Sequence, residues 1–519
     1  MNAPVPSRAV RLAWNAGWNM AGQTGLAALG FWLIPFIIRK LGPEGYALYS
    51  LLGILSGYLM LLALGAGTAT IKYVSEHAAA GRQGALRTIL GASFWLHGLG
   101  VALGAAAVFA FRHELSGQFF KVEPSSLEAA AWVVACSAGG AVFFALGQYG
   151  QSILQGLQRY DLSNAFSLLQ SGVFLGGVAI LLWLGHGIHA IGTLFIVVSA
   201  LVCFAVLTTA ARLAPVPPSW RFWREARSQT VRDFLTFSVS GVIGQVAWSV
   251  AFQWDKMFIG HMLPLSQLTY YLIPSAILQK FWLIPWTIIT AAFPMLSELH
   301  GAGDQAGVKR FYRKCSQLVL WIVVPGFVML MVLAPQFLTL WLGEEFSHYG
   351  TWPLRLLTMG YFIYFMGSMP GVAAGGLGRM RYAVWANIAL AACCLLFWRF
   401  FIPRLGIVGA ALGFLIAFAA AFLPFLFFVN RDFFRMSWLE YLKDVCLRPF
   451  LAGAVLLAIV WAAHFRIHTW ASFVLVGGLS AAVYFSLSLL LLDHDSHESL
   501  KDVLSAFRKG LALKLAWIN

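Results

Sequence analysis

The sequence predicts an all-α polytopic membrane protein with about 14 transmembrane helices. Of its 519 residues, 60% are hydrophobic and only 11% are charged, and the mean hydropathy is +0.77. A soluble domain typically carries about 25% charged residues. A helix needs about 20 mostly apolar residues to cross a bilayer, and the chain repeatedly contains runs of this length.

The apolar runs can be assigned in chain order, with polar turns or basic loops between them. They lie near residues 16–38, 46–71, 88–111, 127–155, 163–184, 188–211, 233–258, 267–292, 315–334, 351–374, 382–402, 406–429, 447–465 and 469–492. No connecting loop is longer than about twenty residues. We therefore expect no extramembrane catalytic domain, and the function is expected to lie within the membrane.

Basic residues predict the orientation of these spans. The formal net charge is +15, and about 25 of the 35 Lys and Arg residues fall on alternate loops that share a side with the N-terminus. Cytoplasmic loops are enriched in Lys and Arg, so both termini are predicted to be cytoplasmic. The same bias explains the net charge without a nucleic-acid partner.

The longest inner connection, residues 212–232, divides the chain into two predicted lobes. Pro215, Pro217 and Pro218 end the preceding helix, and the tryptophans and arginines that follow suit a short helix at headgroup level. We assign an N-lobe to 1–211, a cytoplasmic linker to 212–232, a C-lobe to 233–430, and two extra helices to 431–492. Residues 493–519 are predicted to form an amphipathic cytoplasmic tail.

The two lobes carry a related pattern. FIIRKLGPEGYALY (36–49) and MFIGHMLPLSQLTYY (257–271) both place a proline six residues before a tyrosine at a junction between two helices: Pro43 with Tyr49, and Pro264 with Tyr270. Six spans separate the copies, which predicts two six-helix lobes of the same orientation around a central cavity. Transporters of this type bind substrate between lobes and expose it alternately to each side.

Three ionisable residues interrupt the two spans around Pro264. They are Asp255, Lys256 and Lys280, and each charge at the centre of a membrane helix costs roughly 2.5–3.5 kcal/mol. On a continuous helix Asp255 and Lys256 point about 100° apart, so we expect them not to pair. Lys280 lies deeper than Lys256 by roughly 12 Å and is the better candidate for function. The alternative role for Asp255 is that of a structural partner of Lys280.

Amides form stripes on three spans, which predicts a water-filled cavity or a sugar path. Interhelical packing, with hydrogen bonds of roughly 1 kcal/mol each, is the alternative explanation. The residues in these stripes are Asn15, Asn19 and Gln23 on the first span, Gln148, Gln151 and Gln155 on the fourth, and Gln245 and Gln253 on the seventh. On the seventh span, Ser238, Ser249 and Lys256 share the face of the two glutamines.

Basic residues also lie at the outer ends of spans, against the charge rule: Arg39, Lys40, Arg355 and Arg399. They are interpreted either as anchors that extend to the membrane surface or as a basic vestibule for an anionic headgroup. No HExxH, Walker or GxSxG motif occurs, so we expect no enzyme activity and no metal or other cofactor.

The sequence resembles the polysaccharide transporter family. The resemblance rests on IIRKLGPEGYALYSL (37–51), GAGTATIKYVSE (65–76), and a second-lobe pattern that runs from WDKMFIGHML (254–263) to Pro294-Met295-Leu296-Ser297 and Gly303-Asp304. It covers about residues 1–430. One departure is Leu268-Thr269-Tyr270, where the family often has glycine before the tyrosine. The same superfamily includes drug/cation antiporters and flippases of lipid-linked peptidoglycan precursors.

The resemblance implies a flippase for polyprenyl-pyrophosphate-linked oligosaccharide in the bacterial inner membrane, serving surface polysaccharide such as lipopolysaccharide. In that role Lys280, Lys256, Arg355 and Arg39 would bind pyrophosphate, and the amide stripes would bind sugar hydroxyls. Asp255 would couple transport to H⁺ or Na⁺. Polysaccharide polymerase and chain-length proteins are the implied protein partners.

Four other functions are weighed against this one. A multidrug/cation antiporter, or a flippase of lipid-linked peptidoglycan precursor, would have the same fold. The antiporter would favour buried acidic groups, whereas buried basic residues are more numerous here. A membrane polymerase or ligase would need a large outer loop with catalytic residues, and a scaffold would need no charges inside its spans.

Overall fold

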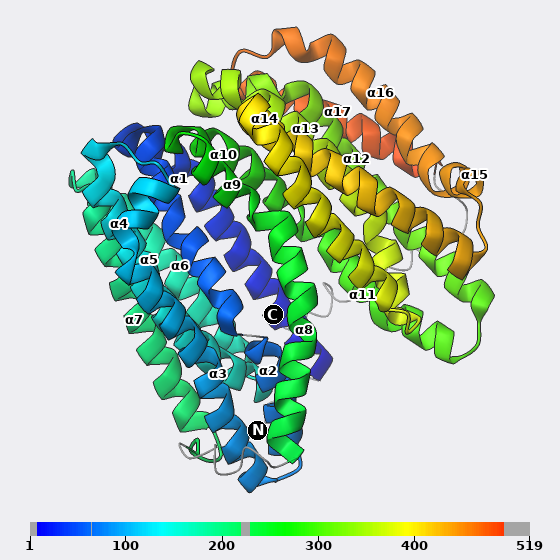
Figure 1. The fold of residues 1–519 in the computed structure, drawn as a ribbon. Helices are drawn as coiled ribbons and strands as arrows, with labels where there is room; N and C mark the ends of the chain where they lie inside the picture. Colours follow the sequence, from blue (N-terminus) through cyan, green and yellow to red (C-terminus); the bar gives the residue numbers. More distant parts are fainter. Residues whose placement is uncertain (1–7, 64, 220–228, 492–519) are drawn as a thin grey trace, which may run out of the picture. The chain divides into compact units, whose positions relative to one another are not determined.

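The computed structural model describes residues 8–63, 65–219 and 229–491, and these residues form helices joined by short turns, with no strand among them (Figure 1). Eleven helical segments in this part of the chain are long and apolar enough to cross a membrane. The predicted class, an all-α polytopic membrane protein, is confirmed. The predicted tail at 493–519 and most of the predicted linker helix (220–228) lie outside the described residues.

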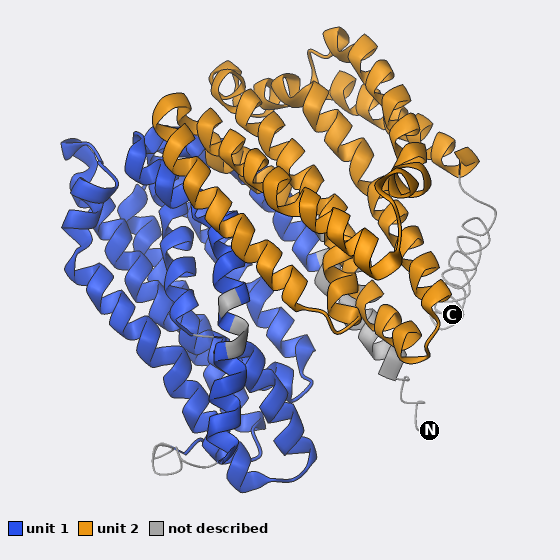
Figure 2. Cartoon of the chain, turned by 45° about the vertical axis from the view of Figure 1, so that its right-hand side comes forward, with its two compact units in different colours: residues 1–269 blue, residues 270–519 orange. Residues whose placement is uncertain are grey.

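The helices fall into two compact units, residues 1–269 and 270–519 (Figure 2). Unit 1 holds α1 (Arg8–Leu59), α2 (Ala66–Ala79), α3 (Gln83–Ala110), α4 (Arg112–Glu114), α5 (Leu127–Gly156), α6 (Tyr160–Trp183), α7 (Ile188–Leu213), α8 (Gln229–Gln253) and α9 (Asp255–Met262). Unit 2 holds α11 (Leu283–Gly301), α12 (Gln305–Leu342), α13 (Glu344–Gly376), α14 (Arg381–Phe434), α15 (Trp438–Tyr441), α16 (Leu447–Ala463) and α17 (Trp470–Leu491). Helix α10 (Leu265–Phe281) crosses the boundary.

This boundary between compact units differs from the predicted lobe boundary at 212–232. Contacts place α8 and α9 with the helices before them, whereas the repeat pattern places the seventh span at the start of the C-lobe. Compactness and internal repetition are different properties, so the lobe assignment stays a prediction.

Several predicted spans are joined or divided in the structure. Helix α1 runs through the first span and most of the second, with a kink at Gly42, whose φ of 74° lies in the left-handed region that glycine tolerates best. Helix α14 joins the eleventh and twelfth spans across Gly406, with φ of 59°. The eighth span is divided between α10 and α11 at Trp282. The count of about 14 stays a prediction.

Unit 1 is organised around α5. This helix packs against α1, α2, α3, α6 and α7, and small residues let the backbones approach, as is usual between membrane helices. The Ser56 hydroxyl donates to the Ser137 carbonyl at 2.9 Å, which joins α1 to α5. The start of α2 lies against α8 so closely that a Cβ atom at Gly65 would lie 2.6 Å from the Ser238 carbonyl oxygen.

Unit 2 is built on α12, which packs against α11, α13, α16 and α17. Its first turn is capped by Asp304, whose carboxylate accepts from the Gly307 backbone N–H at 2.7 Å. Two ion pairs then join α12 to the segment that precedes α16: Lys309 with Glu440 at 3.0 Å and Arg313 with Asp444 at 2.6 Å.

Candidate functional site

The charged residues of the seventh span lie at a helix break. Helix α8 ends at Gln253 and α9 begins at Asp255, with Trp254 as the turn residue between them. The Asp255 carboxylate accepts from the Lys256 backbone N–H at 2.9 Å, so the carboxylate sits at the first turn of α9. A negative charge is favourable there because the helix dipole is positive at its N-terminus.

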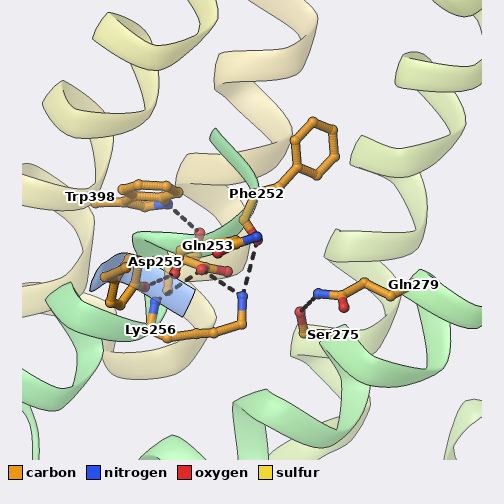
Figure 3. Close-up of polar contacts among 9 residues, drawn as sticks. Phe252, Gln253, Asp255, Lys256, Ser275, Gln279 and Trp398 are labelled. Carbon is orange, nitrogen blue, oxygen red and sulfur yellow. Dashed lines mark hydrogen bonds and ion pairs between the residues drawn. The ribbon is translucent and has the colours of Figure 1, made fainter. Parts of the chain in front are cut away.

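Asp255 and Lys256 form a buried ion pair. The Lys256 Nζ lies 2.8 Å from Asp255 Oδ1, and it also donates to the Phe252 carbonyl at 3.1 Å (Figure 3). The two residues are 2% and 7% exposed. The expectation that these neighbours cannot pair is wrong. It assumed a continuous helix, whereas the carboxylate folds over the start of a new helix and the long lysine side chain reaches back to it.

Helix α1 contacts the same break. The Tyr58 hydroxyl donates to the Gln253 carbonyl at 2.5 Å, and the Tyr58 ring meets the Trp254 ring edge-on with centroids 6.2 Å apart. The hydrogen bond engages the backbone carbonyl of the last residue of α8. The residues directly before the ion pair are therefore contacted by Tyr58 of α1.

The other predicted pyrophosphate ligands lie in different surroundings. Lys280 is exposed in the last turn of α10, and Arg39 is exposed in α1. Arg355, in α13, is half-buried: its Nε donates to the Met331 carbonyl at 2.8 Å, and its guanidinium carbon lies 5.6 Å from the centre of the Trp352 ring. Lys256 and Arg39 belong to unit 1, and Lys280 and Arg355 to unit 2.

The glutamines of the fourth span face α6. Gln155 donates through Nε2 to the Ser163 hydroxyl at 2.9 Å. The Gln151 Oε1 atom accepts from the hydroxyls of Ser167 at 3.2 Å and Ser163 at 3.4 Å. Part of this amide stripe thus serves helix packing within unit 1, as the alternative explanation predicted.

No contact among the described residues brings the remaining predicted sugar-path residues together. Gln23 and Gln245 are exposed, and Gln253 is half-buried. Asn15 and Asn19 lie within α1, but their side chains are outside the described part of the structure.

Gln148 and Gln151 of the α5 stripe border a cavity within unit 1. The cavity has a volume of about 270 Å³ and lies between α5, α6 and α7. It is lined by Phe144, Gln148, Gln151, Ser167, Gln170, Ser171, Phe174, Phe195, Val198 and Ser199. Gln148 and Gln151 were predicted as sugar-path residues, and the structure brings these two together at one cavity.

Sequence reasoning missed the polar residues contributed by α6 and α7. On α6, Ser163, Ser167, Gln170 and Ser171 recur at spacings of four, three and one, which place them on one helical face. That pattern is visible in SNAFSLLQS (163–171) and could have been found. Ser199 is a lone serine in an apolar run of α7, so only the packing of the helices reveals its place.

Sequence reasoning also missed a buried histidine in unit 1. His97, in α3, is 2% exposed, and its Nδ1 donates to the Ser93 carbonyl at 2.9 Å. The Ser93 hydroxyl is in turn 2.5 Å from that of Thr70, in α2. These bonds join α2 to α3 and satisfy polar groups inside the unit, as buried polar groups require.

Comparisons with known proteins agree with this fold. A model of the family described as polysaccharide biosynthesis protein matches residues 12–300, more than half of the chain. A curated protein of Shigella flexneri, "Putative O-antigen transporter", is 22% identical over 404 residues, which are 77% of this chain and 93% of the relative.

Solved structures of two transporters have the same fold. The lipid II flippase MurJ superposes with a TM-score of 0.69 at 14% identity, over 91% of this chain and 98% of that one. A multidrug resistance transporter of the MATE family, in the MOP superfamily, superposes with a TM-score of 0.65 at 15% identity, over 78% and 94% of the two chains. With its membrane-length helices and the family match across 12–300, this chain belongs to the polysaccharide biosynthesis protein family.

Proposed function

We propose that this protein is a flippase that moves polyprenyl-pyrophosphate-linked oligosaccharide across the bacterial inner membrane for surface polysaccharide biosynthesis. The observation that carries the proposal is the family match over residues 12–300 in a chain with eleven membrane-length helical segments. The relative from Shigella flexneri, "Putative O-antigen transporter", matches over most of both chains, which supports a glycan-bearing substrate.

The headgroup of such a substrate needs cationic partners. Phosphate oxygens bind Lys and Arg through charge-assisted hydrogen bonds. Lys280 is the first candidate because its side chain is exposed, whereas Lys256 is held by Asp255 at 2.8 Å. Arg39 is exposed, and Arg355 keeps guanidinium donors beyond its bond to Met331. These four residues are the proposed pyrophosphate ligands.

The Asp255–Lys256 ion pair provides a way to couple ion uptake to substrate binding. Protonation of Asp255 would neutralise the carboxylate that lies 2.8 Å from Lys256 Nζ and would free the ammonium for a phosphate oxygen. Ion uptake at Asp255 and headgroup binding at Lys256 would thus favour each other. Moving one charge across about 100 mV supplies about 2.3 kcal/mol, enough to bias alternation between two lobes, 1–211 and 233–430.

The cellular setting follows from the substrate. Sugar assembly takes place where nucleotide-activated sugars are available, on the cytoplasmic face, and polymerisation follows outside. We therefore propose both termini in the cytoplasm, in agreement with the Lys and Arg bias of the loops. Polysaccharide polymerase and chain-length proteins are the proposed partners.

A flipping assay in proteoliposomes tests the proposal. Wild-type protein should translocate undecaprenyl-pyrophosphate-linked oligosaccharide, and Lys280→Ala should slow translocation about tenfold to a hundredfold, because one charge-assisted hydrogen bond contributes about 1.5–3 kcal/mol. Lys443→Ala, which removes an exposed lysine of unit 2, is the matched control and should flip at the wild-type rate.

The assay has two informative failures. A wild-type protein that does not flip the lipid would overturn the proposed function, and transport of a cationic drug instead would favour an antiporter. If wild type flips and Lys280→Ala flips equally well, the function stands and the assignment of Lys280 is wrong.

A further inference from the structure

The cavity between α5, α6 and α7 is polar in a place where polar groups are costly. All three helices are membrane-length segments, and water is absent from the lipid that surrounds such helices. Gln151 has its oxygen engaged by Ser163 and Ser167. Gln148 and Gln170 make no hydrogen bond with any side chain or backbone group of the described residues, although both line the cavity.

These amides need a hydrogen-bonding occupant. Each glutamine side chain offers two N–H donors and an acceptor oxygen, and an unsatisfied polar group away from water costs about 1–3 kcal/mol. Ser199 is only 3% exposed and lines the same cavity. Two amides and a hydroxyl on three different helices therefore converge on one space, which packing alone does not require.

The lining specifies the chemical class of the occupant. None of the ten lining residues is ionisable, so the cavity does not suit a pyrophosphate or a cationic drug. Amides and hydroxyls both donate and accept, as sugar hydroxyls do. Phe144, Phe174 and Phe195 provide apolar walls against which the C–H face of a sugar ring can pack.

The volume limits the size of the occupant. About 270 Å³ equals the space of roughly nine water molecules at about 30 Å³ each, which is room for about one sugar ring. Ser171 is exposed at the edge of the cavity, so the space reaches the surface of unit 1. The remaining sugars of an oligosaccharide can extend from there.

We propose that this cavity is a subsite for one uncharged sugar ring of the transported glycan, bound by Gln148, Gln170 and Gln151. The inference rests on the proposed function, because the sugar belongs to the lipid-linked substrate. It adds that glycan recognition takes place within unit 1, at a cavity that no charged residue lines.

Binding measurements with two lipids test the subsite. The probes are undecaprenyl-pyrophosphate-linked oligosaccharide and undecaprenyl pyrophosphate without sugar, titrated into the full-length protein in detergent. The variant Gln148→Met/Gln170→Met removes both amides at nearly constant size. Its Kd for the sugar-bearing lipid should rise about tenfold or more, because each lost hydrogen bond weakens binding severalfold. Its Kd for the sugar-free lipid should stay within twofold of wild type.

A control and a second variant keep the test decisive. Gln336→Met changes a glutamine in α12 of unit 2, whose amide bonds to the His464 carbonyl, and should leave both affinities unchanged. Ser171→Leu narrows the cavity from its exposed edge without removing an amide, and it should weaken only the sugar-bearing lipid. If the double variant does not fold, Ser171→Leu tests the subsite in its place.

The outcomes separate the two proposals. If wild type prefers the sugar-bearing lipid and the cavity variants keep that preference, the cavity holds water only and the subsite is wrong. Equal binding of both lipids by wild type also overturns the subsite. Binding of neither lipid by wild type overturns the proposed function itself.

Discussion

At the scale of single residues, the break at Trp254 decides what two neighbouring charges do. Asp255 begins α9, and its carboxylate accepts both the Lys256 backbone N–H and the Lys256 ammonium. A buried ion pair adds little stability compared with apolar residues of the same size, yet removing one partner is costly because it leaves an uncompensated charge.

We expect Asp255→Ala to lower the free energy of unfolding by about 3–5 kcal/mol. Thermal unfolding in detergent measures the change. Asp255→Ala/Lys256→Met should recover much of the loss, since it removes both charges. Asp161→Ala is the control: Asp161 pairs with Arg159 at 3.0 Å, but both side chains are exposed, so its loss should cost below about 1 kcal/mol. Equal costs for both single variants would contradict the buried pair.

A second residue-scale prediction concerns Gly65. Its φ of 70° is left-handed, and a Cβ atom there would lie 2.6 Å from the Ser238 carbonyl oxygen. Gly65→Ala should therefore lower the midpoint of thermal unfolding, with a cost of about 1–3 kcal/mol from backbone strain. Gly53→Ala is the matched control, because nothing lies within 4 Å of its Cβ position. A Gly65→Ala protein as stable as wild type would show that α2 and α8 can separate at little cost.

At the scale of elements, polar contacts join helices that apolar packing alone would leave free to slide. Tyr312 in α12 donates to the Asn430 Oδ1 atom in α14 at 2.9 Å. Close by in sequence, Lys309 and Arg313 pair with Glu440 and Asp444. The glutamines of the fourth span also join helices, because Gln151 and Gln155 of α5 bond to serines of α6. Gln151 also lines the cavity, together with Gln148.

The Lys309–Glu440 pair should make the stability of unit 2 depend on pH. The hydrogen bond from Lys309 lowers the pKa of the Glu440 carboxyl below its ordinary value, against a smaller opposite effect of burial. A lowered folded-state pKa means that the stabilisation is present above the unfolded-state pKa and is lost as the pH falls through the folded-state pKa.

Thermal unfolding of wild type and Glu440→Gln, measured from pH 7 down to pH 3, checks this dependence. Wild type should be more stable by less than about 1 kcal/mol near neutral pH, because the pair is partly exposed. The difference should disappear at the acid end. A difference that persists at pH 3 would mean that the ion pair is not its cause.

At the scale of the whole molecule, the charge bias of the loops predicts which side of the membrane each turn faces. With the six native cysteines replaced by alanine, Gly187→Cys lies in a turn predicted to be outside, and Ala302→Cys in one predicted to be inside. A membrane-impermeant maleimide added to intact cells should label Gly187→Cys at once and Ala302→Cys only after permeabilisation. The reverse pattern would invert the topology and place both termini outside.

The class of the molecule and most of its segments can be predicted from the amino-acid sequence alone. Length, hydropathy and charge are summed along the chain, so a run such as 188–211 is recognisable as a membrane helix without knowledge of its neighbours, and α7 (Ile188–Leu213) follows it closely. The family resemblance, carried by motifs such as GAGTATIKYVSE (65–76), was confirmed by the match over 12–300. Asp304, which belongs to a motif beyond that match, caps the first turn of α12.

The contacts of the polar side chains, in contrast, depend on how the helices pack in three dimensions. A helical wheel assumes an unbroken helix, so it could not foresee the break at Trp254 or the ion pair that follows from it. It also treats each helix alone. The partners of Gln151 lie on α6, and the cavity that joins Gln148 to Ser199 exists only where α5, α6 and α7 pack together. Whether a buried amide is satisfied depends on three-dimensional distances, which the order of residues does not contain.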